Sequence, residues 1–482
     1  MNQKSGPDAG AADAGAAGAG AAGAGGARTS GAGSKSSESL NPNDALDYMC
    51  AEARRLGADA FDAVAGESES MGLELFESKV KSTEISNSRG IGIRLFKDRR
   101  PGFAFTEKMS REAISQTVKD ALSHTLITDE VEMELPFPAQ LPSIDLKSYN
   151  PELEDVTLDR MKALGLELEA IARAADKRID NIPYLGASRS SGMSMVRNSN
   201  GIAYSSRSNV VSAGIGVVAK DGENKKMGVY SNGGRSFSFD PVFMSNKAVE
   251  RAVELLGAES ISSGRYPVVF SNRVSTSIMS MFGSPFFAEA VQKGQSRLAG
   301  KVGQQIAVPM LNITSNPHIP GAPGSHLFDG EGVITSPLQV IKEGVLQTYL
   351  YNLESAKKAG IKPTGSGSRG YSGKAGTGFS NYIVDKGDKT LEELLSVYPQ
   401  CLYVTKLEGG SGCSAISGEI SIGAQGFWYE QGKRIKPVDK ITLSSNYFDL
   451  LLAIRGFSNE YSDSFSSVKV PDMLVESMHV SG

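Results

Sequence analysis

The chain has 482 residues, a formal net charge of −4 and no cluster of basic residues, which argues against nucleic acid as its main partner. No apolar run approaches the roughly eighteen residues that a membrane-spanning helix requires. The three cysteines, Cys50, Cys401 and Cys413, are too few for a disulfide scaffold and are typical of a reducing compartment. The composition therefore predicts a cytoplasmic protein that binds neither nucleic acid nor membrane.

Residues 1–39 consist almost entirely of glycine, alanine and serine and lack the hydrophobic segment of a signal peptide. Such residues cannot bury enough surface to offset the entropy of an ordered chain. We expect this segment to be a disordered, flexible tail.

Residues 40–262 predict one α+β domain built from two related strand-helix units. In the first unit, about 60–126, strand-like runs at 61–65, 72–84, 90–97 and 102–106 precede a helix capped by Ser110. A proline-rich acidic stretch at 127–155 is typical of a linker. The second unit, about 156–258, has a helix, strand-like runs at 192–197, 201–206, 210–220 and 226–231, and a final helix at 245–258. GIGIRLFKDRRPGFAF in the first unit corresponds to GIGVVAKDGENKKMGVY in the second.

Residues 263–482 predict a β-rich C-terminal domain. Two runs, 333–341 and 345–351, indicate a hairpin, followed by a helix that begins after Asn352 and ends at Gly360. An apolar segment at 274–292 is interrupted by glycine and proline, a short helix is expected at 391–398, and a second hairpin is expected at 419–443. We expect the first hairpin, its helix and the glycine-rich loop after them to form a surface for an extended peptide or a partner chain.

Short motifs for chemistry are sparse. GSGSRG at 365–370 lacks the preceding strand and following helix of a dinucleotide site. His318 and His326 lie eight residues apart in a proline-glycine loop and, with Asp329, are one candidate metal group; capping or solvated histidines are the alternative. Backbone at Gly409, Gly410 and Gly412 could approach a ligand closely, although a plain connecting loop has the same composition.

Long ordered blocks carry a resemblance to a known family. Residues 90–122, 328–365, 402–446 and 470–482 resemble the TldD/PmbA family, in its PmbA (TldE) branch. The resemblance extends from about residue 45 to the end and implies a role in zinc-dependent proteolysis of small proteins or peptides.

The resemblance also locates the positions where a TldD-type subunit holds its metal. The H-E-x-x-x-H helix of that subunit aligns with residues 279–284, where this chain has Met279, Ser280, Gly283 and Ser284 at the motif positions and their neighbours. The cysteine ligand near the C-terminus aligns within 461–471, which contains no cysteine. Thioether and hydroxyl groups do not replace imidazole and thiolate as zinc ligands.

The resemblance therefore implies a subunit with no catalytic residue and no cofactor of its own. It would pair with a TldD-like H-E-x-x-x-H chain that holds zinc and cleaves the peptide or small-protein substrate, and it would contribute substrate binding through Gly409, Gly410, Gly412 and Asp329. The alternative is a stand-alone peptide-binding or scaffold protein. A third possibility is a hydrolase whose metal is held by His318, His326 and Asp329.

Overall fold

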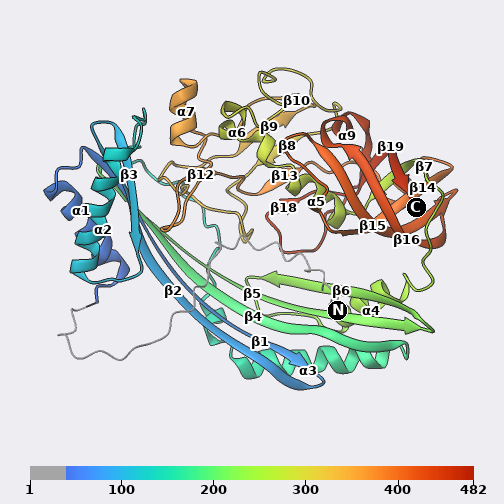
Figure 1. Cartoon of the computed structure of the whole chain (residues 1–482). Coiled ribbons are helices and arrows are strands. Elements are labelled where there is room, and N and C mark those ends of the chain that lie inside the picture. The colour runs from blue at the N-terminus through green and yellow to red at the C-terminus, as the bar shows by residue number, and fades with distance from the viewer. Residues whose placement is uncertain (1–38) are drawn as a thin grey trace, which may run out of the picture.

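The computed structural model describes residues 39–482, so the tail expected at 1–39 lies outside the described residues except for Ser39. A six-stranded antiparallel sheet, ordered β3-β2-β1-β4-β5-β6, forms the N-terminal half of the described chain and curves beneath the C-terminal half (Figure 1). Its strands are β1 (Ala60–Phe76), β2 (Lys79–Lys97), β3 (Arg100–Thr106), β4 (Ile179–Asn198), β5 (Ala203–Asp221) and β6 (Asn224–Gly234). Each predicted unit contributes three strands, and β1 pairs with β4, so the two units share one continuous sheet.

Two pairs of helices cover the two ends of this sheet on one face. Helices α1 (Pro42–Arg55) and α2 (Arg111–His124) pack on Phe61, Ala63 and Ala65 of β1 at one end. Helices α3 (Leu158–Ala175) and α4 (Pro241–Val253) pack at the other end, where Leu73 and Leu75 lie in the core. These five residues occupy odd-numbered positions in β1, and alternate residues of a strand point to the same face. Both helix pairs therefore cover the same face of the sheet.

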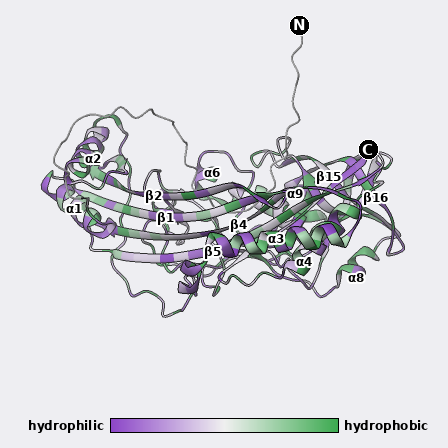
Figure 2. Ribbon diagram, turned by 90° about the horizontal axis from the view of Figure 1, so that it is seen from below, coloured by the Kyte–Doolittle hydropathy of each residue, from purple (hydrophilic) through white to green (hydrophobic). Residues whose placement is uncertain are grey.

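Between these helical layers the middle of the sheet is polar and uncovered. Residues 67–69 of β1 and 79–89 of β2 are exposed, and Figure 2 shows the hydrophobic colouring concentrated where helices lie against the strands. This polar middle explains the main error of the strand prediction, because serine-rich and glycine-rich residues inside long strands looked like loops. The runs at 61–65 and 90–97, and those at 192–197 and 210–220, are parts of strands of 17 to 20 residues.

One predicted strand contains a turn that the sequence does not signal. The run at 72–84 spans the end of β1, a two-residue turn and the start of β2. Both turn residues, Glu77 and Ser78, have positive φ angles of 47° and 60°. Such angles usually select glycine or asparagine, so this hairpin carries neither of the usual turn residues.

The C-terminal half is α+β and β-rich, as predicted. A second six-stranded sheet has the order β16-β15-β14-β7-β19-β17, and a five-stranded sheet has the order β10-β9-β8-β13-β18. Their strands are β7 (Gly264–Phe270), β8 (Ile313–Ser315), β9 (Leu338–Lys342), β10 (Val345–Leu346), β13 (Tyr382–Val384), β14 (Gln400–Glu408), β15 (Glu419–Glu430), β16 (Lys433–Asn446), β17 (Ile454–Phe457), β18 (Val468–Lys469) and β19 (Met473–Ser481). A two-residue pair, β11 (Gly367–Ser368) and β12 (Gly376–Thr377), lies in the glycine-rich loop.

The helices of this half are short. They are α5 (Asn272–Met281), α6 (Ala288–Gln292), α7 (Leu353–Ala359), α8 (Leu391–Leu395) and α9 (Tyr447–Ala453), together with the 3-10 turn η3 (Ser284–Phe286). The 3-10 turns η1 (Thr125–Ile127) and η2 (Pro151–Asp155) lie in the N-terminal half. Asn352 caps α7 through the amide of Ser355, and Gly360 ends it at φ 68°, as predicted. The strands of the first hairpin are shorter than predicted, because residues 333–337 and 347–351 lie outside β9 and β10. None of the helices in residues 39–482 has the length and apolar character to cross a membrane.

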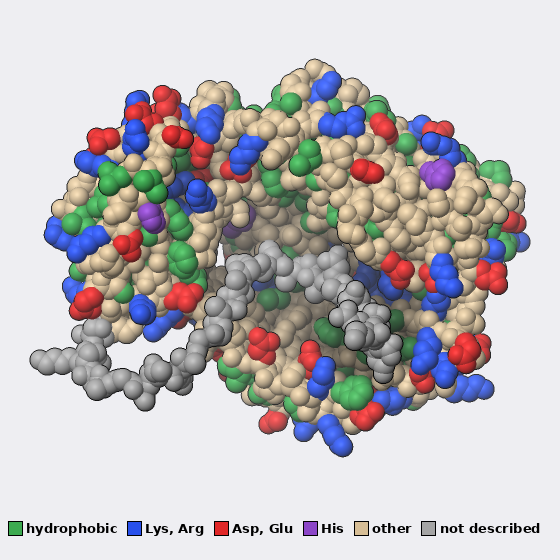
Figure 3. All heavy atoms as spheres, in the orientation of Figure 1, with side chains coloured by type: hydrophobic (Ala, Val, Ile, Leu, Met, Phe, Trp, Pro, Cys, Tyr) green, Lys and Arg blue, Asp and Glu red, His purple; other side chains and the backbone are tan. Residues whose placement is uncertain are grey.

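The glycine-rich loop joins the two halves instead of remaining free. Tyr371 lies against β1 and β2, where a Cβ on Gly90 would come within 2.2 Å of its ring and a Cβ on Gly92 within 1.9 Å of its carbonyl oxygen. Arg369 of the same loop forms an ion pair with Asp62 of β1. The loop therefore packs against the N-terminal sheet. The space-filling view also shows a hollow between the long sheet and the C-terminal half (Figure 3).

Candidate functional site

Helix α5 fixes the segment that aligns with the family's metal-binding helix. Met279 is fully buried in the C-terminal core, and Tyr447 donates a hydrogen bond from its hydroxyl to the Met279 sulfur at 3.9 Å. Phe282 stacks on Tyr447 with ring centroids 4.5 Å apart and an interplanar angle of 7°. Ser280 and Ser284 are the exposed members of this segment. The helix is therefore anchored by apolar contacts on one side and presents hydroxyls on the other.

Residues 461–471 are held against the other half of the molecule and then run beside α5. Tyr230 of β6 donates a hydrogen bond to the carboxylate of Asp463, and the Phe465 amide donates to Asn232 Oδ1 at 2.9 Å. The Ser467 carbonyl accepts a hydrogen bond from the Tyr382 amide at 2.7 Å, and β18 pairs in parallel with β13. The structure thus brings together the two segments that are far apart in sequence and that the resemblance singles out.

A pocket of about 340 Å³ lies where these segments meet. Its walls come from the end of α5 and η3, from the segment that leads into β13, and from the start of β18. The lining residues are Ser280, Met281, Gly283, Ser284, Phe287, Phe379, Ser380, Tyr382, Ser467 and Val468. None of these residues carries a charge, so the pocket offers aromatic and aliphatic surface, a thioether and hydroxyl groups.

Aromatic packing shapes the inner wall of the pocket. Phe379 and Tyr382 meet edge to face with centroids 4.5 Å apart, and Phe287 lies 5.9 Å from Phe379. Tyr382 is 2% exposed, and Phe287, Phe379, Met281 and Val468 pack against the main core cluster. The wall is therefore continuous with the hydrophobic core and is rigidly supported.

A buried serine in the pocket faces a histidine. Ser380 Oγ lies 3.5 Å from His326 Nε2, and His326 Nδ1 lies 2.9 Å from the Gly324 carbonyl oxygen. Because a carbonyl can only accept, Nδ1 carries the proton and Nε2 is the acceptor for the Ser380 hydroxyl. Burial lowers the pKa of His326, which keeps the ring neutral at neutral pH.

The loop with Gly409, Gly410 and Gly412 lies beside the same pocket. A Cβ on Gly410 would have one neighbour within 4 Å, the sulfur of Met281 at 3.9 Å, and Met281 lines the pocket. Gly412 has a local packing reason, because its Cβ would come within 2.4 Å of the Ser421 carbonyl. Gly409 has φ 74° and open space around it. Of the three predicted residues, Gly410 therefore has the closest spatial relation to the pocket.

Asp329 lies elsewhere, at the contact between the two halves. It is 2% exposed and accepts hydrogen bonds from the amides of Glu331, Val333 and Gly367. Burial, and then the charge of Glu331, raise the pKa of Asp329 to about 7 against the opposing effect of these three donors. Its carboxylate organises the loop at 329–333 and does not line the pocket.

The metal group suggested for His318, His326 and Asp329 is wrong. His318 Nε2 lies 3.1 Å from the Thr335 hydroxyl, and His326 is engaged with Gly324 and Ser380. Within residues 39–482, no three or more His, Cys, Asp and Glu side chains gather in a group that could hold a metal ion. Both rings are instead held by hydrogen bonds to other groups of the protein.

The donor set at the family's metal position does not fit zinc. It consists of the Met279 thioether, the Ser280 and Ser284 hydroxyls and a glycine, with Ser467 across the pocket. Structural and catalytic zinc sites use imidazole, thiolate or carboxylate ligands. The residues at this position therefore do not provide a zinc site.

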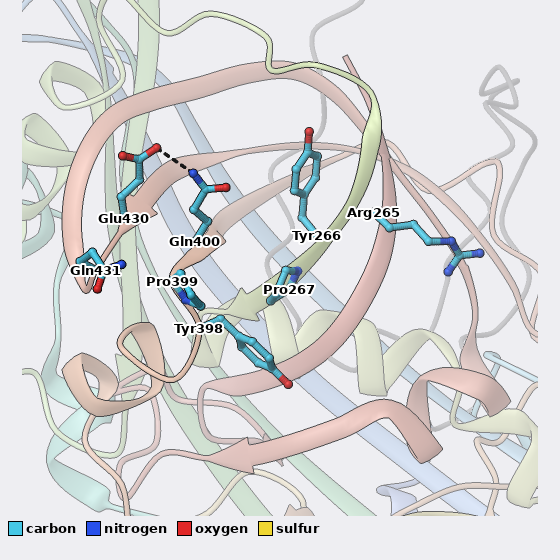
Figure 4. A pocket seen from close by; sticks show the side chains of 8 residues that line it. All are labelled: Arg265, Tyr266, Pro267, Tyr398, Pro399, Gln400, Glu430 and Gln431. Atoms are coloured by element: carbon cyan, nitrogen blue, oxygen red, sulfur yellow. Dashed lines mark hydrogen bonds between the residues drawn. The ribbon is translucent and has the colours of Figure 1, made fainter.

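A second pocket of about 480 Å³ lies at the ends of β7, β14 and β15 in the C-terminal sheet (Figure 4). Its lining residues are Arg265, Tyr266, Pro267, Tyr398, Pro399, Gln400, Glu430 and Gln431. Gln400 donates a hydrogen bond to Glu430 at 3.2 Å, which closes part of its rim. It shares no residue with the pocket at α5.

Sequence reasoning missed most of the lining of the pocket at α5. Phe379, Ser380 and Tyr382 are carried by the stretch FSNYIV, which contains no recognisable binding motif, and Phe287 lies in the interrupted apolar segment at 274–292. Their signal is tertiary, because segments about 100 and 190 residues beyond Ser280 complete the cavity. Only the family alignment of 279–284 and 461–471 pointed to this place.

Comparison with known proteins identifies the family of the chain. Three family models match in order: PmbA/TldA metallopeptidase domain 1 over residues 61–124, the central domain over 151–256 and the C-terminal domain over 263–482. The chain belongs to the PmbA/TldD family of metallopeptidases.

Its relatives include proteins of the PmbA type. It is 28% identical to a metalloprotease PmbA homolog of Haemophilus influenzae, over 91% of this chain and 95% of that one. It is also 28% identical to metalloprotease PmbA of Escherichia coli O157:H7, over 84% and 88% of the two chains.

Solved structures share this fold. A putative modulator of a DNA gyrase from Thermotoga maritima matches with a TM-score of 0.83 and 28% identity, over 91% of this chain and all of that one. TldE from Thermococcus kodakarensis has a TM-score of 0.83 at 20% identity, with 91% and 100% covered, which establishes a shared fold.

Proposed function

We propose that this chain is the non-catalytic, PmbA/TldE-like subunit of a cytoplasmic metalloprotease that acts on small proteins or peptides. It pairs with a TldD-like subunit that carries H-E-x-x-x-H and holds the zinc. The observation that carries the proposal is the combination of a family match along nearly the whole described chain with thioether, hydroxyl and glycine at the aligned metal positions. A fold that is retained while its metal ligands are replaced is better suited to binding and assembly than to activating water.

The pocket at α5 supports a role in guiding substrate. It lies at the aligned motif, has an intact aromatic wall and exposes serines at its mouth. Concave sites with apolar walls and a few polar groups are the usual form of a ligand-binding site. The loop at 409–412 lies beside it and supplies backbone with little side-chain bulk.

Co-purification tests the proposal directly. A tagged chain expressed from its own genome should retain a second chain that contains H-E-x-x-x-H, identified by mass spectrometry of the native complex. Mixing the two purified chains should produce peptidase activity that a zinc chelator removes and that neither the present chain nor a His→Ala variant of the partner's motif produces. If no such chain is retained and peptides still bind, the stand-alone peptide-binding or scaffold protein becomes the better account.

A further inference from the structure

We propose that the pocket at α5 receives the uncharged apolar or aromatic side chain of an extended peptide. This inference deepens the proposed function and rests on it for the identity of the ligand as a peptide. The selectivity for an uncharged side chain is a property of the pocket alone.

The electrostatics of the lining exclude a charged occupant. The ten lining residues carry no charge, and the ionisable group hydrogen-bonded to the pocket, His326, is neutral because burial lowers its pKa. The amino group of Lys469, next to Val468, donates to the carbonyls of Ser462 and Ser464 at 3.2 and 2.6 Å and is therefore occupied by its own loop. A carboxylate or ammonium group that entered would lose its hydration without gaining a counter-charge, and that loss is costly.

The shape of the lining favours a side chain with an apolar body. Phe287, Phe379 and Tyr382 present aromatic surface, and Met281 adds a flexible thioether that adapts to different shapes. The volume of about 340 Å³ is at the lower end of the range for ligand sites, which suits a single side chain better than a large cofactor.

An extended backbone is the form of ligand that fits the surroundings. β18, which supplies Val468, is the last strand of the five-stranded sheet in the described part of the chain. A peptide that adds to a sheet edge gains main-chain hydrogen bonds, while pockets beside the edge select alternate side chains. Ser280 and Ser284 are exposed at the mouth and can hydrogen-bond to the peptide groups that flank the bound side chain.

Binding to the purified chain alone tests the inference without any partner. The probes are fluorescein-labelled, end-capped peptides of the form Gly-Gly-Gly-X-Gly-Gly-Gly, with X as Phe, Leu, Ser, Glu or Lys, followed by fluorescence anisotropy. We expect the Phe and Leu peptides to bind at least tenfold more tightly than the Glu and Lys peptides. Equal affinity for all five peptides, or no binding of any, overturns the inference and leaves the co-purification result to decide the proposed function separately.

Two variants locate the binding at this pocket. Ser284→Trp places a large ring at the mouth and should reduce affinity for the Phe peptide at least tenfold, whereas Ser123→Trp, on the exposed surface of α2, should not change it. Ser467→Glu adds a charge to the wall and should reverse the preference, so that the Lys peptide binds more tightly than the Phe peptide. Unchanged selectivity in Ser467→Glu overturns the inference even if Ser284→Trp does not fold.

Discussion

Arg369 of the glycine-rich loop donates a hydrogen bond from Nη1 to Oδ1 of Asp62 in β1 at 2.5 Å, and both side chains are at most 1% exposed. Asp62 also receives the guanidinium of Arg94, whose Nη1 lies 2.9 Å from Glu331 Oε1. Burial alone would raise the pKa of Asp62, but Arg369 and Arg94 hold it below its usual value. Two arginines and two carboxylates thus form a buried network where the two halves of the molecule meet.

We expect Asp62→Ala to lower the free energy of unfolding by about 3–5 kcal/mol, because it leaves Arg94 and Arg369 buried with one counter-charge. Urea denaturation followed by circular dichroism measures the loss. The matched control is Asp180→Ala, which removes an exposed pair with Lys225 at 3.0 Å and should cost less than about 1 kcal/mol. Equal losses in the two variants would show that the buried network contributes no more than a surface pair.

Asp329 should make the stability of the folded protein depend on pH. Its folded pKa of about 7 lies above the usual value of 3.8, so the folded state binds the proton more tightly than the unfolded state. Stability from this group is therefore greatest below about pH 4 and falls as pH rises toward 7, by at most roughly 1.4 kcal/mol per pH unit. Above pH 7 its contribution becomes constant.

The measurement compares urea unfolding of wild type and Asp329→Asn between pH 4 and 8. In the variant the amide oxygen can still accept hydrogen bonds from Glu331 and Val333, the bond from Gly367 is lost, and the side chain cannot titrate. The stability of the wild type relative to the variant should therefore fall as pH rises from 4 to 7 and stay constant beyond it. Two parallel curves over this range would contradict the raised pKa.

The packing of Tyr371 against the glycines of β2 should be disrupted by the addition of one methyl group. In Gly92→Ala the new Cβ would lie 1.9 Å from the Tyr371 carbonyl oxygen, so the loop or the strand must move, at a cost of about 1–3 kcal/mol. Gly370→Ala in the same loop is the control, because its Cβ would have no neighbour within 4 Å. Thermal unfolding followed by circular dichroism should show a lower Tm for Gly92→Ala alone, and equal Tm values would mean that the loop is not docked.

These contacts illustrate what sequence reasoning could and could not predict. Local signals predicted the caps of α2 and α7 at Ser110 and Asn352 and the hairpin within 419–443, since each depends on neighbouring residues. The pairing of β1 with β4, which joins the two units into one sheet, was not predictable in the same way, because the polar middle of the sheet resembles loop sequence. Its stability comes from pairing between distant strands and from helices at both ends.

The candidate site likewise contains some features that the sequence predicted and others that depend on the fold. The family alignment placed residues 279–284 and 461–471, but Ser380 and its partner His326 required the fold. The spacing of His318 and His326 in one loop suggests a metal ligand pair, whereas the structure surrounds His326 with a carbonyl and a hydroxyl. Gly412 shows the converse, because its close approach to the Ser421 carbonyl explains the glycine without any ligand.

We expect the purified chain to contain no stoichiometric zinc and to cleave no unstructured peptide, because its aligned motif positions offer Met279, Ser280, Gly283 and Ser284. Elemental analysis after dialysis against zinc, together with a peptidase assay, measures both properties. One tightly held zinc per chain that is lost in His318→Ala or His326→Ala would contradict the prediction.

The loop beside the pocket provides a test that separates binding from folding. Gly410 has open space around its Cα apart from the Met281 sulfur at 3.9 Å, so Gly410→Trp should fold with native circular dichroism and an unchanged Tm. The indole would then lie beside the pocket, where it should obstruct an extended peptide and lower cleavage by the reconstituted pair at least tenfold. Gly373→Trp, at a glycine in the loop docked on β1 and β2 with no neighbour within 4 Å of its Cβ, is the control and should leave cleavage unchanged. Cleavage at the wild-type rate by Gly410→Trp would make the loop a simple connector, while equal losses in both variants would indicate a general disturbance of the pair and not an effect at the pocket.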